Sequence, residues 1–376
     1  MIDRCIANDL KKTLDSGKAV ILLGPRQVGK STLLKMIFGS QDGVKWFTGD
    51  DSADRGALSG VSLNRLKLIV GTSETVVIDE AQKISGIGET MKLITDHLPD
   101  VRLIATGSSS FQLTKDLGDS LAGRKREFKL FPISFSEMVQ HSGLIEEERN
   151  IPLRMIYGYY PEVVMNPGSE RDILRELSDS YLYKDILSLE SIAKGEKLER
   201  LVQALALQIG SQVSYNELAQ IVGIDYKTVE KYIDILEKCY IVFRLPSYAR
   251  NLRNELKFSR KVYFYDLGIR NAVLGNFTPL DLRTREEAGH MWENFMIAER
   301  MKVNEYGRKF TKSYFWRTEQ QKEVDLIEEL DGVLSAFEFK WDPDKKVKTP
   351  SQFTAAYPDA TFESVSPKNA AEFLLG

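Results

Sequence analysis

The segment Gly24–Ser31 constrains the fold of this chain more than any other. It reads GPRQVGKS and has the spacing GxxxxGK[ST], in which backbone N–H groups surround the phosphates of a nucleotide. The apolar run KAVILLG precedes it, and STLLKMIF, which has helical periodicity, follows it. A buried strand, a glycine-rich loop and a helix in this order predict an α/β domain with a parallel sheet.

The residues of this loop have distinct expected roles. We expect Lys30 to contact the β- and γ-phosphates and Ser31 to bind Mg²⁺, while the helix N-terminus attracts the same anions. ATP and Mg²⁺ are therefore the expected ligands. The predicted nucleotide-binding residues are Gly24, Pro25, Arg26, Gln27, Val28, Gly29, Lys30, Ser31 and Thr32.

A second apolar strand, in ETVVIDEAQ, ends at two acidic residues, Asp79 and Glu80. In P-loop proteins an acid at the tip of such a strand holds Mg²⁺, so Asp79 is the predicted metal-binding carboxylate. Glu80 is the predicted catalytic residue that orients or deprotonates the attacking water. The structural alternative is a strand followed by an acid that only caps a helix.

The next two segments offer further catalytic candidates. Thr106 and Ser108, at the end of VRLIATGSSS, are candidates to sense the γ-phosphate or orient water, and an ordinary Gly/Ser turn is the alternative. Arg124, in LAGRKREFKLFPIS, precedes another strand and is a candidate arginine finger, in its own or a neighbouring subunit. Arg126 competes for this role, and an exposed turn arginine is the structural alternative.

These four segments together resemble prokaryotic AAA-type ATPases that carry a C-terminal domain of unknown function. The motifs that carry the resemblance are GPRQVGKST, VVIDEAQ, ATGSSS and LAGRKREFKLFPISFSE. The resemblance extends over nearly the whole chain and implies an ATPase. DEAQ also suggests a helicase, but no later segment looks like the second motor core that a helicase requires.

The middle of the chain has the pattern of a winged helix. The helical stretch EKLERLVQALALQIGS precedes a short helix, SYNELAQIVG, that Gly223 stops. Asp225 is placed as the N-cap of a third helix, YKTVEKYIDILEKCY, which completes a helix-turn-helix. The alternating runs YIVFRLPSY and KVYFYDLG are predicted to form the wing.

The charges of this region favour two different partners. The outward face of the last helix carries Tyr226, Lys227, Glu230 and Lys231, a mixture of signs that is poor for binding phosphates. Between Ile241 and Arg270 the charge is +5, which favours duplex DNA. The alternative is a module for packing or for binding a protein. The seven cations are Arg244, Arg250, Arg253, Lys257, Arg260, Lys261 and Arg270.

Near the end of the chain, AFEFKW places Glu338 and Lys340 on one face of a strand, because strand side chains alternate. A hairpin turning at 331–332 would bring Asp325 close to Glu338. Glu293 lies upstream on a predicted helix.

This order resembles the PD-(D/E)xK nuclease superfamily, although no Pro-Asp pair precedes the ExK. The resemblance implies a second metal site formed by Glu293, Asp325 and Glu338 with Lys340. The alternative is a fold that serves as a structural or binding module, with Asp325 and Lys340 as an ion pair.

The predicted architecture is therefore a P-loop ATPase core (1–155), bridging helices with a winged helix (156–280) and a small α/β nuclease-like domain (281–376). The expected function is Mg²⁺-dependent ATP hydrolysis acting on or regulated by DNA. The alternatives are a nucleotide-gated protein-interaction switch with a non-catalytic C-terminal domain, and a nucleotide-controlled transcription regulator.

Composition limits the remaining possibilities. The net charge of −3 argues against a uniformly basic nucleic-acid coat. Two distant cysteines and three scattered histidines indicate no disulfide framework or zinc knuckle, and they suit the cytoplasm. No apolar run approaches a membrane span, so we expect no membrane partner. Self-association and a protein partner both stay open.

Overall fold

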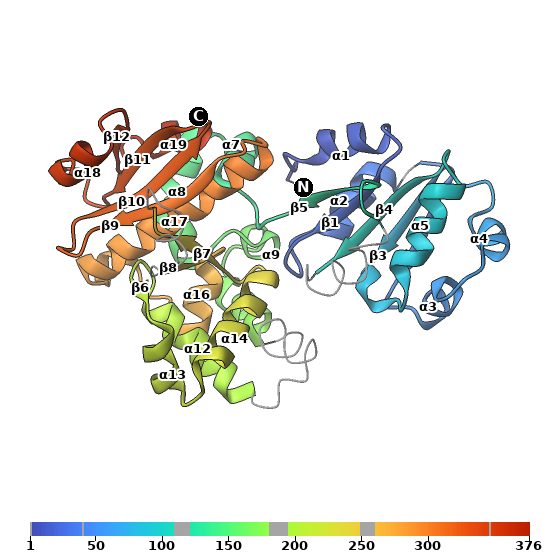
Figure 1. Ribbon diagram of the computed structural model, residues 1–376, viewed down its shortest axis with the longest axis horizontal. Coiled ribbons are helices and arrows are strands. Elements are labelled where there is room, and N and C mark those ends of the chain that lie inside the picture. Colours follow the sequence, from blue (N-terminus) through green and yellow to red (C-terminus); the bar gives the residue numbers. More distant parts are fainter. Residues whose placement is uncertain (1, 40, 109–120, 180–194, 249–259, 346) are drawn as a thin grey trace. The chain divides into compact units, whose positions relative to one another are not determined.

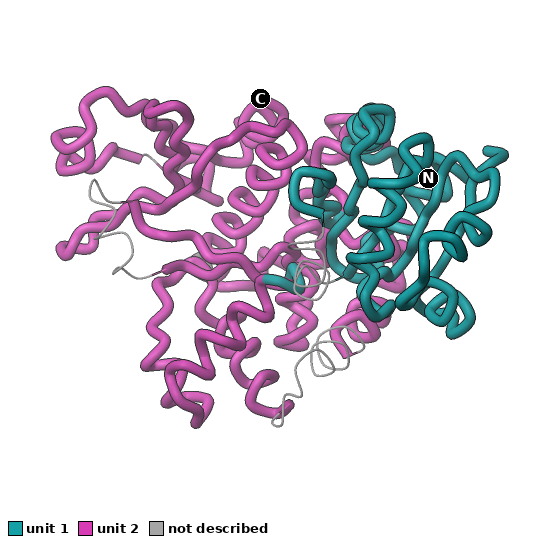
Figure 2. The backbone as a smooth tube through the Cα atoms, turned by 45° about the vertical axis from the view of Figure 1, so that its right-hand side comes forward, with its two compact units in different colours: residues 1–132, 238–240 teal, residues 133–237, 241–376 magenta. Residues whose placement is uncertain are grey.

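A computed structural model describes residues 2–39, 41–108, 121–179, 195–248, 260–345 and 347–376. The chain divides into two compact units (Figure 2). The first unit is Met1–Pro132 with Lys238–Tyr240, and the second is Ile133–Glu237 with Ile241–Gly376. No helix in the described residues is long and apolar enough to cross a membrane.

A parallel five-stranded sheet forms the centre of the first unit (Figure 1). Strands β1 and β3 are almost wholly apolar and buried, as central parallel strands must be. The sheet order is β2-β3-β4-β1-β5, which confirms the predicted α/β fold and its P-loop core. The strands are β1 Ala19–Leu23, β2 Val44–Thr48, β3 Thr75–Asp79, β4 Arg102–Gly107 and β5 Lys125–Lys129.

The helices of this unit connect the parallel strands. They are α1 Ala7–Leu14, α2 Lys30–Phe38, α3 Ser52–Leu58, α4 Leu63–Val70, the short η1 Ala81–Lys83 and α5 Ile87–His97. Because the strands are parallel, the loops that leave their carboxyl ends meet at one edge of the sheet. That edge carries the loop before α2 and the acids Asp79 and Glu80 at the end of β3.

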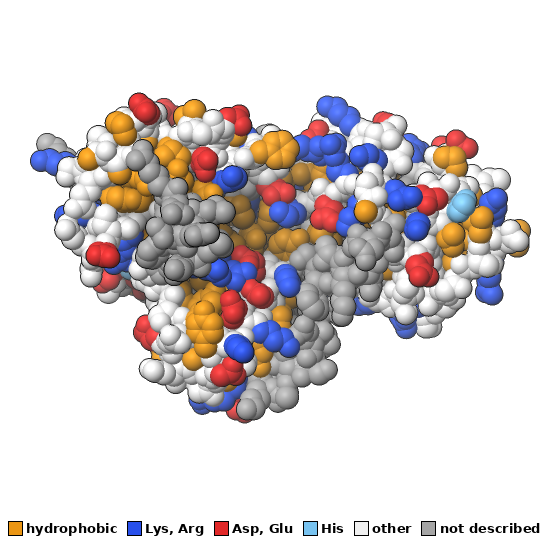
Figure 3. All heavy atoms as spheres, viewed as in Figure 1, with side chains coloured by type: hydrophobic (Ala, Val, Ile, Leu, Met, Phe, Trp, Pro, Cys, Tyr) orange, Lys and Arg blue, Asp and Glu red, His pale blue; other side chains and the backbone are white. Residues whose placement is uncertain are grey.

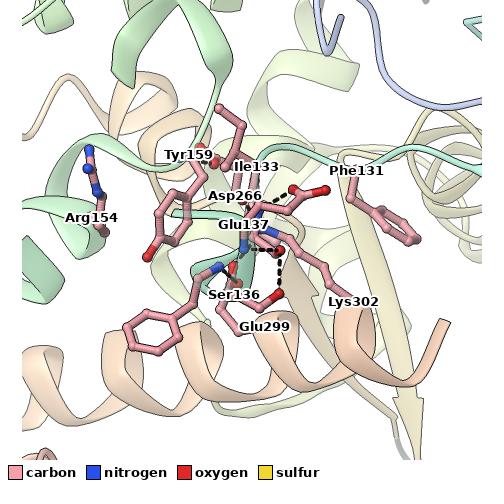
Figure 4. Close-up of polar contacts among 12 residues, drawn as sticks. Phe131, Ile133, Ser136, Glu137, Arg154, Tyr159, Asp266, Glu299 and Lys302 are labelled. Atoms are coloured by element: carbon pink, nitrogen blue, oxygen red, sulfur yellow. Dashed lines mark hydrogen bonds and ion pairs between the residues drawn. The ribbon is translucent and has the colours of Figure 1, made fainter. Parts of the chain in front are cut away.

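The second unit begins at a buried polar network that holds the entering chain (Figure 4). The Glu299 carboxylate accepts hydrogen bonds from the backbone N–H of Phe135 (2.7 Å) and from Lys302 Nζ (2.6 Å). Lys302 Nζ also donates to the Ile133 carbonyl at 3.1 Å. Lys302 is buried, and this pairing offsets the cost of burying its charge. The first helices here are α7 Phe135–Ser142, α8 Leu144–Tyr157, α9 Pro161–Met165 and α10 Glu170–Leu177.

Helices and strands occupy the region where the winged helix was predicted. Ser214 is the N-cap of helix α13, and its hydroxyl accepts a hydrogen bond from the Glu217 N–H. Gly223, in a left-handed conformation, is the C-cap of the same helix. A small sheet of order β6-β8-β7 lies beside the helices. The elements are α12 Gly195–Leu207, β6 Gln212–Val213, α13 Tyr215–Val222, α14 Tyr226–Lys238, β7 Val242–Pro246, β8 Arg260–Phe264 and α16 Leu267–Leu274. Most of the predicted wing loop lies outside the described residues, and the winged-helix identity stays a prediction.

A four-stranded sheet and one long helix form the rest of the unit. The hairpin predicted at Asp331 and Gly332 is present, and both residues have positive φ. Helix α17 lies along the sheet (Figure 1). The sheet order is β12-β11-β10-β9. The elements are η3 Leu280–Leu282, α17 Arg285–Tyr306, β9 Lys312–Arg317, β10 Glu323–Leu330, β11 Val333–Phe339, α18 Ser351–Ala356, β12 Thr361–Val365 and α19 Ala370–Leu375.

The division between the units does not coincide with the predicted domain limits at 155 and 280. The first unit ends at Pro132, and α7 and α8 belong to the second. Helix α16 packs against both α8 and α12, so the bridging helices and the central module share one compact unit. The predicted limits at 155 and 280 therefore separate segments with different predicted functions, and they are not the limits of the compact units.

Candidate functional site

The loop between β1 and α2 has the geometry that its glycines predict. A Cβ atom on Gly24 would lie 2.1 Å from the Leu130 carbonyl oxygen, so no side chain fits there. Gly29 has φ of 94°, which favours glycine, and it directly precedes α2. Glycine at these two positions therefore fixes the backbone of the loop. The loop leads directly into the first turn of α2, where the backbone N–H groups have no partner within the helix.

Lys30 is folded over this loop. Its Nζ donates to the carbonyls of Gly24 (2.9 Å) and Pro25 (2.8 Å), and the side chain is buried. Burial lowers the pKa of Lys30 to about 8, although the nearby carboxylates of Glu80 and Asp79 oppose that shift. A phosphate group that replaced the carbonyls would bring negative charge to the ammonium and favour its charged form.

The two predicted Mg²⁺ residues are in contact. Ser31 Oγ donates to Asp79 Oδ2 at 2.6 Å, although 48 positions separate the residues in the sequence. A hydroxyl and a carboxylate at one point are oxygen ligands of the kind that Mg²⁺ accepts beside nucleotide phosphates. The described residues therefore fit a magnesium–nucleotide complex.

Thr106 orients the acidic pair. Its hydroxyl donates to the Asp79 carboxylate and accepts the backbone N–H of Glu80 at 3.0 Å. The side chain is fully buried. Thr106, on β4, thus fixes the end of the neighbouring strand β3. The sequence did not distinguish this positioning role from a direct contact with the γ-phosphate.

Glu80 is held by two residues, of which one was not predicted. Its Oε2 accepts from Gln82 Nε2 (2.6 Å) and from Ser108 Oγ (3.3 Å). Gln82 was missed, although its place in DEAQ, two residues after Glu80, was the available signal. The backbone of Glu80 has φ of 49°, a left-handed conformation that costs free energy in a residue with a side chain.

Arg124 lies at the other edge of the sheet. Its carbonyl accepts the N–H of Ala19 at the beginning of β1, whereas the nucleotide loop follows the end of β1. Five strand residues separate the two edges by about 16 Å, and the guanidinium is paired with Asp96. Arg124 therefore does not reach the loop of its own chain, and its action on a neighbouring subunit stays a prediction.

The second predicted site is assembled in the second unit. Its four residues line a pocket of about 1250 Å³. Glu293 comes from α17, Asp325 from β10, and Glu338 from β11, with Lys340 just beyond β11. Lys340 Nζ lies 2.6 Å from Glu338 Oε1 and 4.0 Å from Asp325 Oδ2. Burial, followed by the Asp325 charge, raises the pKa of Glu338 to about 7.

Several further charged residues line this pocket, and two of them, Glu323 and Lys261, lie beside the predicted acids and were not predicted for the site. Glu323 brings a carboxylate oxygen within 4.8 Å of oxygens from Glu293 and Asp325, and we call these three residues the carboxylate cluster. Lys261, from β8, is paired with Glu293 Oε1 at 2.7 Å and with Glu323. Burial raises the pKa of Glu293 to about 7, and Lys261 opposes that shift.

The described wing cations are largely engaged inside the protein. Arg244 is paired with Asp234 and Glu237, Lys261 lies in the pocket, and Arg270 is paired with Glu287. Counting all seven as available for phosphates was therefore wrong for these three. Arg260 is half-buried on β8, and Arg250, Arg253 and Lys257 lie outside the described residues.

Comparison with known proteins divides the chain into three matched segments. Residues 16–139 match the AAA domain family model. Two domains of unknown function match the remainder: DUF8612 over residues 148–280 and DUF4143 over residues 288–370.

Relatives that match over most of this chain are also found. An uncharacterized protein of Mycobacterium tuberculosis is 27% identical over 350 residues, which cover 93% of this chain and 75% of that protein. An uncharacterized protein of Methanocaldococcus jannaschii is 20% identical over 350 residues, covering 86% and 75%.

Among solved structures, a Walker-type ATPase of Pyrococcus abyssi is similar in fold. It has 17% identity and a TM-score of 0.50, and the similarity covers 73% of this chain and 96% of the other. The nucleotide loop, the acids at the end of β3 and the family match to residues 16–139 show that the chain contains a P-loop domain of the AAA type.

Proposed function

We propose that the chain binds ATP with Mg²⁺ and hydrolyses it by in-line attack of water. The contact between Ser31 and Asp79, with Glu80 at the next position, carries this proposal. Bound Mg²⁺ would supply positive charge to the β- and γ-phosphates. Lys30 neutralises charge that develops on the γ-phosphate, and Glu80 orients the attacking water.

The surroundings of Glu80 support its role as the base. Gln82 and Ser108 both donate to Oε2, so the carboxylate is oriented before the nucleotide arrives. Thr106 fixes the backbone on which this carboxylate is mounted. Preorganised groups of this kind avoid a reorganisation cost during the reaction.

We propose two candidate macromolecules on which ATP hydrolysis acts or by which it is regulated: duplex DNA and a protein. DNA is supported by the helix-turn-helix and by the net charge of the predicted wing. A nucleotide-gated protein switch is favoured by the internal pairing of Arg244, Lys261 and Arg270. On the face shown in Figure 3, the described acidic and basic side chains are interspersed.

ATP turnover with and without duplex DNA, at low and moderate salt, tests these proposals. We expect Lys30→Ala to abolish turnover, because the phosphates lose their ammonium. DNA stimulation that falls steeply with salt would support the DNA partner. Turnover that depends on Lys30 but ignores DNA would favour the protein switch. Turnover unchanged in Lys30→Ala would contradict ATP hydrolysis at this loop.

A further inference from the structure

We propose that the ammonium group of Lys261 is the cation of the carboxylate cluster, and that it takes the place of a divalent metal ion there. The proposal concerns the pocket of the second unit and is independent of ATP hydrolysis in the first. It opposes the metal site that the nuclease resemblance implies for Glu293, Asp325 and Glu338.

The position of Lys261 is the first argument. Its Nζ lies 2.7 Å from Glu293 Oε1 and is also paired with Glu323, so it contacts two of the three members of the cluster. The Lys261 side chain is only 1% exposed. The ring of Phe315 lies 5.6 Å from the ammonium and adds a favourable cation–π contact. Strand β8 therefore delivers a fixed positive charge into the acidic pocket.

The oxygens that a metal would need are the second argument. Glu293 Oε1 already accepts from Lys261 and from the Tyr263 hydroxyl, at 2.6 Å. Asp325 Oδ2 accepts the backbone N–H of Phe339 at 2.8 Å. A divalent ion requires several such oxygens at about 2.0–2.6 Å, and it would repel an ammonium held in the same cluster.

The balance of charge is the third argument. Six carboxylates line the pocket, and four of them, those of the cluster and of Glu338, take part in the ion pairs of this site. Three cations face them: Lys261, Lys340, which pairs with Glu338, and Arg317, which lies 3.4 Å from Glu323. This near-neutral set needs no divalent ion to offset repulsion among the acids. The carboxylates of the pocket are thus arranged as in a metal site, and the ammonium group of Lys261 supplies the positive charge that a metal ion would otherwise supply.

Titration of the full-length, nucleotide-free protein with Mn²⁺ tests the proposal, with binding measured by calorimetry. We expect wild-type protein and Asp325→Asn to bind Mn²⁺ equally weakly, because Lys261 occupies the cluster. We expect Lys261→Met to bind Mn²⁺ at least tenfold more tightly than wild type, and Asp325→Asn to remove that gain in the double variant. Mn²⁺ should likewise raise the melting temperature of Lys261→Met but not that of the wild type.

Lys302→Met is the matched control. Lys302 is equally buried and also pairs with a glutamate, Glu299, but it lies outside the cluster, so its loss should give no Mn²⁺ site. Mn²⁺ binding by wild type that Asp325→Asn removes would overturn the proposal, as would a folded Lys261→Met that gains no Mn²⁺ affinity. If Lys261→Met does not fold, the comparison of wild type with Asp325→Asn decides alone.

Discussion

At the scale of single residues, the nucleotide site combines a buried ammonium group, that of Lys30, with a carboxylate carried on a left-handed backbone, that of Glu80. Lys30 is buried against carbonyls, and Glu80 has a left-handed backbone whose N–H donates to Thr106 on β4. Burial of the Lys30 ammonium and the left-handed backbone of Glu80 each raise the free energy of the nucleotide-free protein. Contacts with phosphate and with water would offset these costs. Changes at these residues should therefore affect nucleotide chemistry more than folding.

Glu80→Gln should keep ATP binding and lose turnover by about 10²–10⁴-fold, the usual contribution of a positioned base. The amide keeps the size of the side chain but cannot accept a proton from water. Single-turnover hydrolysis and ATP affinity, measured separately, check this expectation. Glu74→Gln, an exposed carboxylate just before β3, is the matched control and should behave as wild type. A large loss of ATP affinity in Glu80→Gln would indicate a binding role instead.

The lowered pKa of Lys30 predicts a dependence on pH. The folded pKa of about 8 lies below the ordinary lysine pKa of 10.5, so between these values the unfolded chain binds the proton that the folded chain has lost. The free energy of unfolding of the nucleotide-free protein should therefore rise with pH over this window. ATP affinity should instead fall above pH 8, as the ammonium loses its charge. Parallel denaturation and binding series with Lys30→Met, which should lack both trends, provide the check.

At the scale of elements, caps and glycines fix where the helices begin and end. Helix α7 starts with a capping box, in which Ser134 Oγ accepts from the Glu137 N–H and Glu137 accepts from the Ser134 N–H. The pattern is visible in the sequence as SFSE, and it stands next to the Glu299 network that holds the chain entering the second unit.

Ser134→Ala should lower the free energy of unfolding by about 1 kcal/mol, because one helical N–H loses its side-chain partner. The measurement is urea denaturation monitored by far-UV circular dichroism. Ser169 is also an N-cap serine of the second unit but makes no side-chain cap bond, so Ser169→Ala is the matched control and should cost less. Equal effects of the two substitutions would show that the capping box contributes nothing.

At the scale of the whole molecule, the internal pairing of cations limits how strongly DNA can be bound. Of the seven basic residues that favoured DNA, Arg244, Lys261 and Arg270 pair with acidic residues inside the protein, which leaves Arg250, Arg253, Lys257 and Arg260 as candidate phosphate contacts. If duplex DNA binds through these four, the slope of log K against log [salt] should be no steeper than about −4. Fluorescence anisotropy across a salt series measures it. A much steeper slope would place the DNA on another surface.

The sequence by itself determined the nucleotide loop, the acids after β3, the α/β class and the hairpin at Asp331. These features follow from local rules: glycine at a forced turn, apolar strands, and alternation along a strand. It also placed Glu293, Asp325, Glu338 and Lys340 in one pocket, because a hairpin and one helix suffice to bring them together.

Only the tertiary structure decided which residues accompany these motifs. The parallel pairing of β5 with β1 put Arg124 at the edge away from the nucleotide loop, and the place of β4 next to β3 put Thr106 and Ser108 beside the acids of β3. The packing of β8 turned Lys261 from a presumed wing cation into the buried partner of Glu293. No local pattern contains this information, because which distant side chain meets which carboxylate depends on how separate strands and helices pack.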